Sequence, residues 1–133
     1  MPMNRALEGK VYPEISFAVD AERVARFRSA VGDRSGGAVP PTFVTAIEHA
    51  CFGPLIGDPE LGLDYARVVH GEQAYEWHRP LQVGETVTAR PRIASIRRKG
   101  GLGFLEIETE VRDAAGAVVV IGRFSLIERG AGG

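Results

Sequence analysis

The segment from residue 85 to residue 128 alternates between apolar and polar positions, and this period of two constrains the fold more than any other feature. The alternation is clearest in the stretch 102–112. One face there carries Leu105, Ile107, Thr109 and Val111, and the glutamates between them lie on the other face. Successive side chains of a strand point to opposite faces, so this pattern predicts strands with one buried face. We expect strands over 85–98, 102–112 and 117–128, joined by hairpin turns at 99–101 and 113–116.

Further strand signals come earlier in the chain. The stretches 66–70 and 73–78 also read as strand, and Gly71 between them indicates a β-bulge. A turn follows at 80–84, and a short strand is predicted over 15–19.

Two helices are predicted in the first half. Asp20 can cap a helix that ends at Gly32, with apolar positions at Val24, Phe27 and Val31. Pro41 suits the first turn of a second helix, which Gly53-Pro54 should end. The second helix carries a broad apolar stripe, formed by Phe43, Val44, Ile47, Ala50 and Cys51. A helix this apolar expects burial on most sides, so the sequence predicts an α+β fold in which an antiparallel sheet curls around one helix.

Composition excludes several classes of function. The 133 residues suit one domain, and 16 Lys plus Arg against 17 Asp plus Glu argue against a nucleic-acid surface. The single cysteine, Cys51, permits neither an intrachain disulfide nor a cysteine-based metal site. No segment approaches 18 apolar residues and no signal peptide is visible, so we expect a cytoplasmic protein without a membrane segment. Signatures of metal or nucleotide-hydrolysing sites are absent, and we expect no cofactor.

Four motifs in a fixed order carry a family resemblance. They are AVGD at 30–33, VPPTF at 39–43, HGEQ at 70–73 and HRPL at 78–81, the last continuing into QVGETV. Together they resemble the MaoC-like dehydratase N-terminal domain family over about residues 8–129, with a tail at 130–133 expected to be disordered. The resemblance implies a hot-dog fold, in which a curled sheet wraps one long central helix. It also implies acyl thioesters of coenzyme A or acyl carrier protein as substrates. Active members hydrate 2-enoyl thioesters or dehydrate R-configured 3-hydroxyacyl thioesters.

The resemblance also implies an acid–base pair of site residues, and this sequence lacks one member of the pair at its usual position. Active members carry an Asp followed five residues later by a His, in a pattern similar to GDxNPxH, as an acid–base pair. Asp33 falls at the position of the Asp, but positions 34–39 contain no histidine. His70 is the candidate for the missing partner. The other reading makes Asp33 a turn residue and His70 a hydrogen-bonded core histidine.

We expect the segment 31–43 to form the mouth of an acyl-thioester pocket. Gly36 and Gly37 would let the backbone pass close to a ligand. The amides of Thr42 and Phe43, at the start of the helix, would bind the thioester carbonyl. The alternative is a simple capped loop with no ligand.

Other polar and aromatic residues are expected to be structural. His49 should be a packed or interface histidine and His78 should be exposed. Tyr75 and Trp77 should fill the core or an interface. The basic run 97–99 is expected to be a solvated hairpin tip, although it could grip a coenzyme A phosphate or an acidic carrier protein.

Two classes of function follow. The first is a hydratase or dehydratase subunit, either as an active homodimer or as the non-catalytic, acyl-binding partner of a catalytic hot-dog subunit. The second is an acyl-thioesterase or acyl-CoA-binding protein, for which Glu48 or Asp33 would supply the carboxylate.

Overall fold

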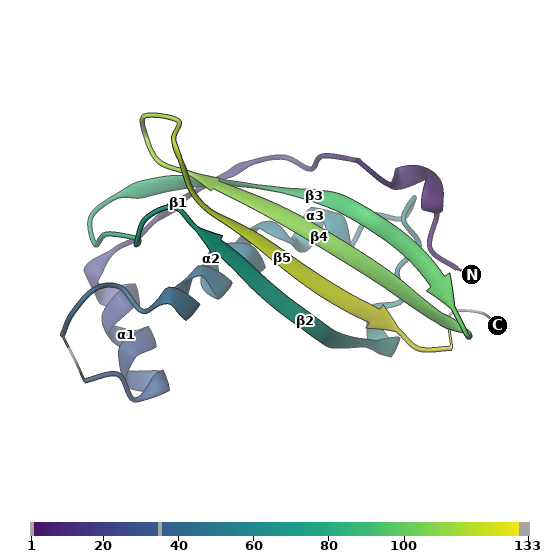
Figure 1. Cartoon of the computed structure of the whole chain (residues 1–133), viewed down its shortest axis with the longest axis horizontal. Helices are drawn as coiled ribbons and strands as arrows, with labels where there is room; N and C mark the ends of the chain where they lie inside the picture. The colour runs from purple at the N-terminus through teal and green to yellow at the C-terminus, as the bar shows by residue number, and fades with distance from the viewer. Residues whose placement is uncertain (1, 35, 131–133) are drawn as a thin grey trace.

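The computed structural model describes residues 2–34 and 36–130, and its main feature is a five-stranded antiparallel sheet (Figure 1). The strand order is β1-β3-β4-β5-β2. The strands are β1 (Ile15–Ala18), β2 (Val68–Trp77), β3 (Thr86–Lys99), β4 (Leu102–Arg112) and β5 (Val118–Glu128). The helices are α1 (Ala21–Val31), α2 (Val44–Cys51) and α3 (Gly53–Ile56), with 3-10 turns at Arg5–Leu7, Pro41–Phe43 and Tyr65–Arg67.

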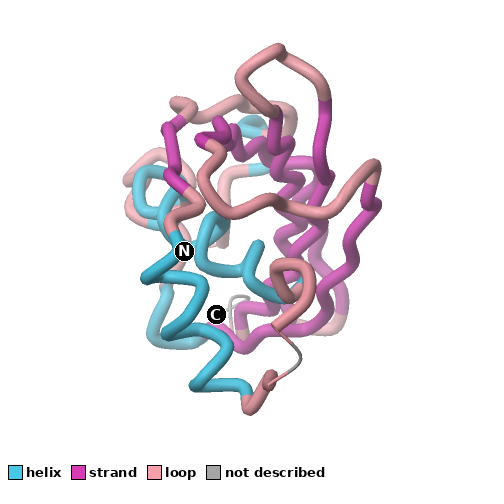
Figure 2. The backbone as a smooth tube through the Cα atoms, turned by 90° about the vertical axis from the view of Figure 1, so that its left-hand side faces the viewer, coloured by secondary structure: helices cyan, strands magenta, loops and turns pink. Residues whose placement is uncertain are grey.

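Helix α2 is buried under the curved sheet, which confirms the predicted hot-dog architecture. Figure 2 shows the helices gathered on one side of the sheet, with the curved strands beside them. Val44, Ile47 and Cys51 have no exposed surface, and they belong to one hydrophobic cluster that extends from Met3 to Leu126. Burying an apolar stripe of this kind is the main stabilising term of such a fold.

The central helix is interrupted near its end. We expected Gly53-Pro54 to end it, but α2 ends at Cys51 and α3 begins again at Gly53. Pro54 has no amide hydrogen for the α2 ladder, yet it fits the first turn of α3. Ala50 was expected in the apolar stripe and is exposed instead.

The outer face of the sheet is polar, as the period of two predicts. Every second residue of β4 is buried from Gly103 to Val111, and the glutamates between them face outward. Two of these glutamates form cross-strand ion pairs, Arg92 with Glu108 at 3.0 Å and Arg90 with Glu110 at 3.7 Å. The outer face is therefore solvated, and the inner face carries the core.

The two stretches predicted around Gly71 form one strand with a bulge. The pairing of β2 with β5 shifts register between His70 and Glu72. A Cβ at Gly71 would lie 2.8 Å from Cδ1 of Ile127, so the position also suits glycine sterically. The bulge was predicted, but the strand is continuous and begins at Val68.

The first helix has the predicted ends. The Asp20 carboxylate accepts a hydrogen bond from the Arg23 amide at 2.7 Å, and Gly32 ends the helix in the left-handed conformation with φ 76°. Val24 is buried, but Val31 is 54% exposed and not part of the expected apolar face. The predicted disorder of residues 130–133 concerns a segment of which only Gly130 lies within the described residues.

Glycine at position 122 of β5 makes room for a side chain of the central helix. A Cβ there would lie 2.7 Å from Oε2 of Glu48 and 3.1 Å from Cε1 of Tyr75. We expect Gly122→Ala to lower the free energy of unfolding by about 1–3 kcal/mol, because the core must shift to admit the methyl group. Chemical denaturation monitored by circular dichroism would measure it. The matched control is Gly53→Ala, where a Cβ has open space, and it should leave stability unchanged or slightly higher. Equal stability of the Gly122→Ala variant would show that the Glu48 carboxyl is not held under this strand.

Candidate functional site

The loop between α1 and α2 is held by one arginine. Arg28 Nη1 lies 3.2 Å from Oδ2 of Asp33, and Arg28 Nη2 donates to the carbonyls of Gly37 at 2.6 Å and Ala38 at 3.0 Å. Both side chains of the ion pair are largely covered, with Arg28 17% and Asp33 24% exposed. Asp33 therefore has a structural task, because its charge fixes the arginine that orders the loop.

The two glycines of this loop have different roles. Gly36 has a positive φ of 66°, and a Cβ at this position would meet no described atom within 4 Å, so Gly36 supplies a turn. Gly37 provides a carbonyl for Arg28. Both are exposed, which leaves their approach to a ligand a prediction.

The start of the central helix offers fewer free donors than predicted. The Phe43 amide donates to the carbonyl of Pro40 at 2.9 Å, so it is not available to a ligand. This corrects the expectation of two donors, because the two prolines start a 3-10 turn that uses the Phe43 amide internally. The Phe43 ring is buried and meets the rings of Phe17 and Phe27 edge to face. The role of the Thr42 amide stays a prediction.

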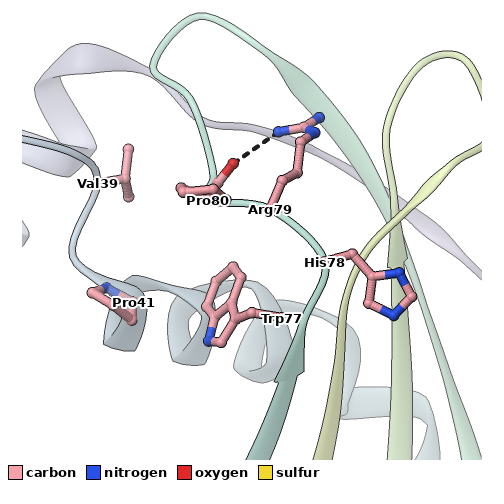
Figure 3. A pocket seen from close by; sticks show the side chains of 6 residues that line it. All are labelled: Val39, Pro41, Trp77, His78, Arg79 and Pro80. Carbon is pink, nitrogen blue, oxygen red and sulfur yellow. Dashed lines mark hydrogen bonds between the residues drawn. The ribbon is translucent and has the colours of Figure 1, made fainter.

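A pocket of about 200 Å³ lies beside this helix start (Figure 3). We call it the mouth pocket, and it is lined by Val39, Pro41, Trp77, His78, Arg79 and Pro80. Its walls come from the loop before α2 and from the end of β2, two segments far apart in the sequence. Trp77 was expected only as a core or interface residue, and sequence periodicity gives no signal that its ring meets this loop.

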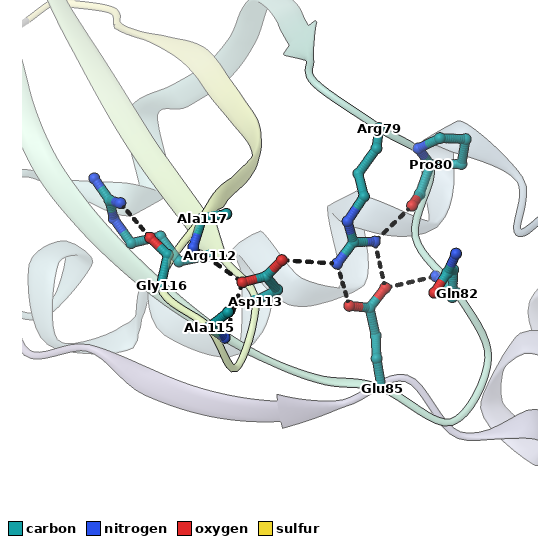
Figure 4. Close-up of polar contacts among 9 residues, drawn as sticks. All are labelled: Arg79, Pro80, Gln82, Glu85, Arg112, Asp113, Ala115, Gly116 and Ala117. Carbon is teal, nitrogen blue, oxygen red and sulfur yellow. Dashed lines mark hydrogen bonds and ion pairs between the residues drawn. The ribbon is translucent and has the colours of Figure 1, made fainter.

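Arg79 fixes the turn that forms one wall of the mouth pocket (Figure 4). Its guanidinium binds the Glu85 carboxylate through two nitrogens, at 2.9 and 2.6 Å, and reaches Asp113 at 3.3 Å. The pKa of Glu85 is lowered, chiefly by Arg79. A bidentate pair of this kind is rigid as well as strong, so the turn is tied to the 113–117 hairpin.

A buried carboxyl group lies in the middle of the central helix. Glu48 has no exposed surface, and its Oε1 accepts from Nε2 of Gln73 at 2.7 Å and from the hydroxyl of Tyr75. Its Oε2 has no hydrogen-bond partner among the described residues and faces Gly122. Burial raises the pKa of Glu48 to about 7, while the hydrogen bonds from Tyr75 and Gln73 oppose the rise. Glu48 was considered from the sequence as the carboxylate of a thioesterase, and the structure places it inside the fold, where β2 supplies two donors.

His70 lies in a second pocket, toward the other end of α2. This pocket has a volume of about 210 Å³, and we call it the aromatic pocket; its lining includes His49, Phe52, Ile56, His70, Gln73 and Phe124. The His70 ring stacks on Phe124 with centroids 4.2 Å apart, and its Nε2 lies 3.1 Å from the carbonyl of Glu72. His70 is exposed, so the reading as a core histidine is wrong: it lies on β2, the edge strand, beside which the described residues place no further strand.

The structure does not bring Asp33 and His70 together within this chain. Asp33 follows α1 and belongs to the loop that leads into the start of α2, whereas His70 shares a pocket with residues at the end of α2 and in α3. Helix α2 alone spans about 12 Å, and it lies between them. A pair built from these two residues of one chain therefore has no support.

The remaining expectations have mixed outcomes. His78 is exposed, 3.0 Å from Glu76, as predicted. His49 is exposed as well, beside the rings of Phe52 and Phe124. Tyr75 and Trp77 pack against the hydrophobic cluster. The basic run 97–99 ends β3, whereas Trp77 of the mouth pocket ends β2, and Figure 1 shows these two strand ends at opposite ends of the sheet. Because of this separation, the basic run is not placed to bind a phosphate group of a ligand in the mouth pocket.

No set of three or more His, Cys, Asp and Glu side chains suited to a metal ion occurs among residues 2–34 and 36–130. In the same part of the chain, no helix has the length and apolar character needed to cross a membrane.

Comparison with known proteins agrees with the geometry. Residues 35–121, more than half of the chain, match the family described as FAS1-like, dehydratase domain region. A UPF0336 protein of Streptomyces coelicolor is 35% identical and the match covers 98% of each chain. A UPF0336 protein of Thermobifida fusca is also 35% identical, over 98% of this chain and 96% of its own.

Solved structures show the same fold. A complex described as HadBC (3R-hydroxyacyl-ACP dehydratase) from Mycobacterium tuberculosis matches with a TM-score of 0.75 and 21% identity, over 91% of this chain and 96% of that chain. A MaoC-like dehydratase matches with a TM-score of 0.84 and 22% identity, over 94% of this chain and 43% of that chain. At this identity the likeness concerns the fold.

The curled sheet around α2 and the motif order thus define a hot-dog protein of the MaoC-like dehydratase type. The chain belongs to the FAS1-like dehydratase region family, and its full-length relatives are UPF0336 proteins. The resemblance found in the sequence is confirmed.

The raised pKa of Glu48 predicts how stability changes with pH. The folded state holds this proton up to a pH of about 7, against an ordinary value of 4.5. The protonated Glu48 carboxyl therefore makes its full contribution to the free energy of unfolding below pH 4.5. This contribution, on the order of 3 kcal/mol, is lost as the pH rises to 7. Glu48→Gln has no such proton, so its stability relative to wild type should rise by this amount between pH 4.5 and 7.5.

Urea denaturation of both proteins at several pH values would measure the difference. The neighbouring titratable groups, Tyr75 and Cys51, have pKa values raised by burial and do not titrate in this range. A difference in unfolding free energy between the two proteins that stays constant across this pH range would show that folding does not raise the pKa of Glu48.

Proposed function

We propose that this chain is the acyl-binding, non-catalytic subunit of an R-specific 3-hydroxyacyl-thioester dehydratase or 2-enoyl-thioester hydratase. A second hot-dog subunit would bring the Asp–His pair. The observation that carries the proposal is the loop before α2. Its Asp33 is paired with Arg28 and no histidine follows, while the mouth pocket beside the same loop remains open.

The acyl-binding part of the proposal rests on the mouth pocket and on the inner face of β2 beside it. The mouth pocket is mostly apolar, and Arg79 holds its outer wall in place. The inner face of β2 continues from Trp77 through Tyr75 to Gln73, where the aromatic pocket begins. An acyl chain would enter at the mouth, with its thioester carbonyl near the Thr42 amide, and run along β2. The positive end of the helix favours a polarised carbonyl there.

The family background supports the pairing of two subunits. The neighbour from Mycobacterium tuberculosis is described as a HadBC complex, so one solved example of this fold works as two different chains. The thioesterase alternative is weaker. The Glu48 carboxyl is buried and faces Gly122, and Asp33 is occupied by Arg28.

The edge of the sheet gives the first prediction of this proposal. Among the described residues, strand β2 pairs only with β5, so its other edge is open along Val68–Trp77. Open edges are normally covered. We expect a dimer in which a second hot-dog subunit, identical or different, adds its own edge strand to β2. Light scattering at micromolar concentration measures the mass, and a monomer would contradict the expectation.

The second prediction concerns activity. Loss of an acid–base partner typically lowers a rate by about 10²–10⁴-fold. The purified chain should therefore hydrate a crotonyl thioester at least about 10²-fold more slowly than the assembly that contains its catalytic partner. The assembly is obtained by co-purification from the source cell, with native mass spectrometry to identify its subunits and assays with crotonyl and longer enoyl thioesters.

A variant separates the two forms of the proposal. Asp33→Asn in this chain should leave kcat of the assembly within a few-fold, because the partner supplies the acid and base, while KM should rise because the loop loses its charged pairing with Arg28. Efficient hydration by the chain alone would overturn the non-catalytic role. In that event His70→Ala should abolish the activity, and the homodimeric alternative would replace the heterodimer.

A further inference from the structure

The carboxyl group of Glu48 is one of three polar side chains that are buried among the described residues, with Thr109 and Glu128. Two donors reach its Oε1, while Oε2 has no partner among the described residues. Burying such a group costs free energy, which hydrogen bonds only partly recover. Three other positions accommodate it: Gly122 leaves the space, and Gln73 and Tyr75 supply the donors. An apolar residue at position 48 would be buried at a lower free-energy cost. The carboxyl group must therefore affect its neighbours in a way that an apolar side chain would not.

That consequence is the orientation of Gln73. Oε1 of Glu48 accepts from both Gln73 and Tyr75, and it can do so whether the carboxyl group is ionised or holds a proton on Oε2. The amide nitrogen of Gln73 must therefore face Glu48, and its carbonyl oxygen must face away. Gln73 is also part of the lining of the aromatic pocket. Nothing among the described residues donates to the Gln73 side-chain carbonyl. A Gln73 carbonyl that faces away from Glu48 would be a fixed acceptor in this pocket, beside Phe52, Ile56 and Phe124.

A fixed acceptor in such a pocket distinguishes between ligands. A saturated chain that covers the Gln73 carbonyl removes its water and returns no hydrogen bond, whereas a hydroxyl group returns one. The stacked pair of His70 and Phe124 would hold the neighbouring carbon atoms. The pocket therefore suits a hydrocarbon segment that carries one hydrogen-bond donor.

We propose that the aromatic pocket binds a hydroxylated segment of the acyl chain and that Gln73 recognises the hydroxyl group. Glu48 acts as the positioning residue, because it fixes the Gln73 amide from inside the core. This inference rests on the proposed acyl-binding function and adds the substrate class. Gln73 lies four positions before Trp77 of the mouth pocket, which is about 13 Å along the strand. The recognised hydroxyl is thus far from the thioester and distinct from the one that the reaction removes.

The test compares matched ligands on the assembly purified from the source cell through a tag on this chain. Calorimetry measures the affinity of dodecanoyl-CoA and of hydroxydodecanoyl-CoA isomers with the hydroxyl in the distal half of the chain. We expect at least one isomer to bind about tenfold more tightly than dodecanoyl-CoA. Gln73→Leu should abolish this preference and keep the affinity for dodecanoyl-CoA. Glu48→Gln should weaken the preference, because an amide at position 48 no longer dictates which way Gln73 turns.

The matched control is Glu72→Gln, which changes an exposed neighbour on the same strand and should preserve the preference. If Gln73→Leu fails to fold, a crystal structure of the wild-type assembly with the preferred isomer decides, since the hydroxyl must lie within hydrogen-bonding distance of the Gln73 carbonyl. Equal binding of all isomers and dodecanoyl-CoA overturns the inference and leaves the proposed function standing. Absence of binding by every acyl-CoA overturns both.

Discussion

The burial of helix α2 under the curved sheet is the constraint on which the rest of this structure depends. The helix is short, and its apolar residues are covered only because β3, β4 and β5 curl around it. The same burial takes Glu48 into the interior. That single carboxyl group then sets requirements on the sheet: a glycine at position 122, and donors from Gln73 and Tyr75 on the edge strand. The burial of α2 therefore constrains residues on two strands: Gly122 on β5, and Gln73 and Tyr75 on β2.

The two ends of α2 carry different chemistry. At its start, Arg28 orders the preceding loop and Arg79 orders the facing turn, so a small apolar pocket forms between two tied segments. Toward its end, α2 is interrupted at Phe52 and the helix resumes as α3. The pocket around Phe124 lies beside this interruption. The edge strand β2 connects both pockets along one face. The two pockets therefore lie at opposite ends of α2, and β2 contributes residues to both of them.

Much of the fold was determined by the sequence itself. The alternation in 102–112 predicted β4 with its buried and solvated faces, because the period of a strand is a local property. Asp20, Gly32 and Gly71 marked a helix start, a helix end and a bulge, since capping, left-handed backbone and register shifts depend on single residues. The motif order from AVGD to HRPL indicated the family, which the match of residues 35–121 to the FAS1-like dehydratase domain region confirms. The absence of a histidine after Asp33 was also evident without coordinates.

Only the tertiary structure decided how the candidate site is assembled. Glu48 was predicted only as a candidate thioesterase carboxylate. Its burial and its two donors from β2 depend on how the sheet covers α2, which helical periodicity does not specify. His70 was predicted as the partner of Asp33, with a core histidine as the alternative, and the structure leaves it exposed and stacked on Phe124. Phe43 was expected to offer its amide, but the 3-10 turn after Pro40 uses it. The pairing of Trp77 with the loop before α2 joins segments more than thirty residues apart. Contacts of this kind depend on the sheet's curvature and strand order, which no local pattern in the sequence encodes.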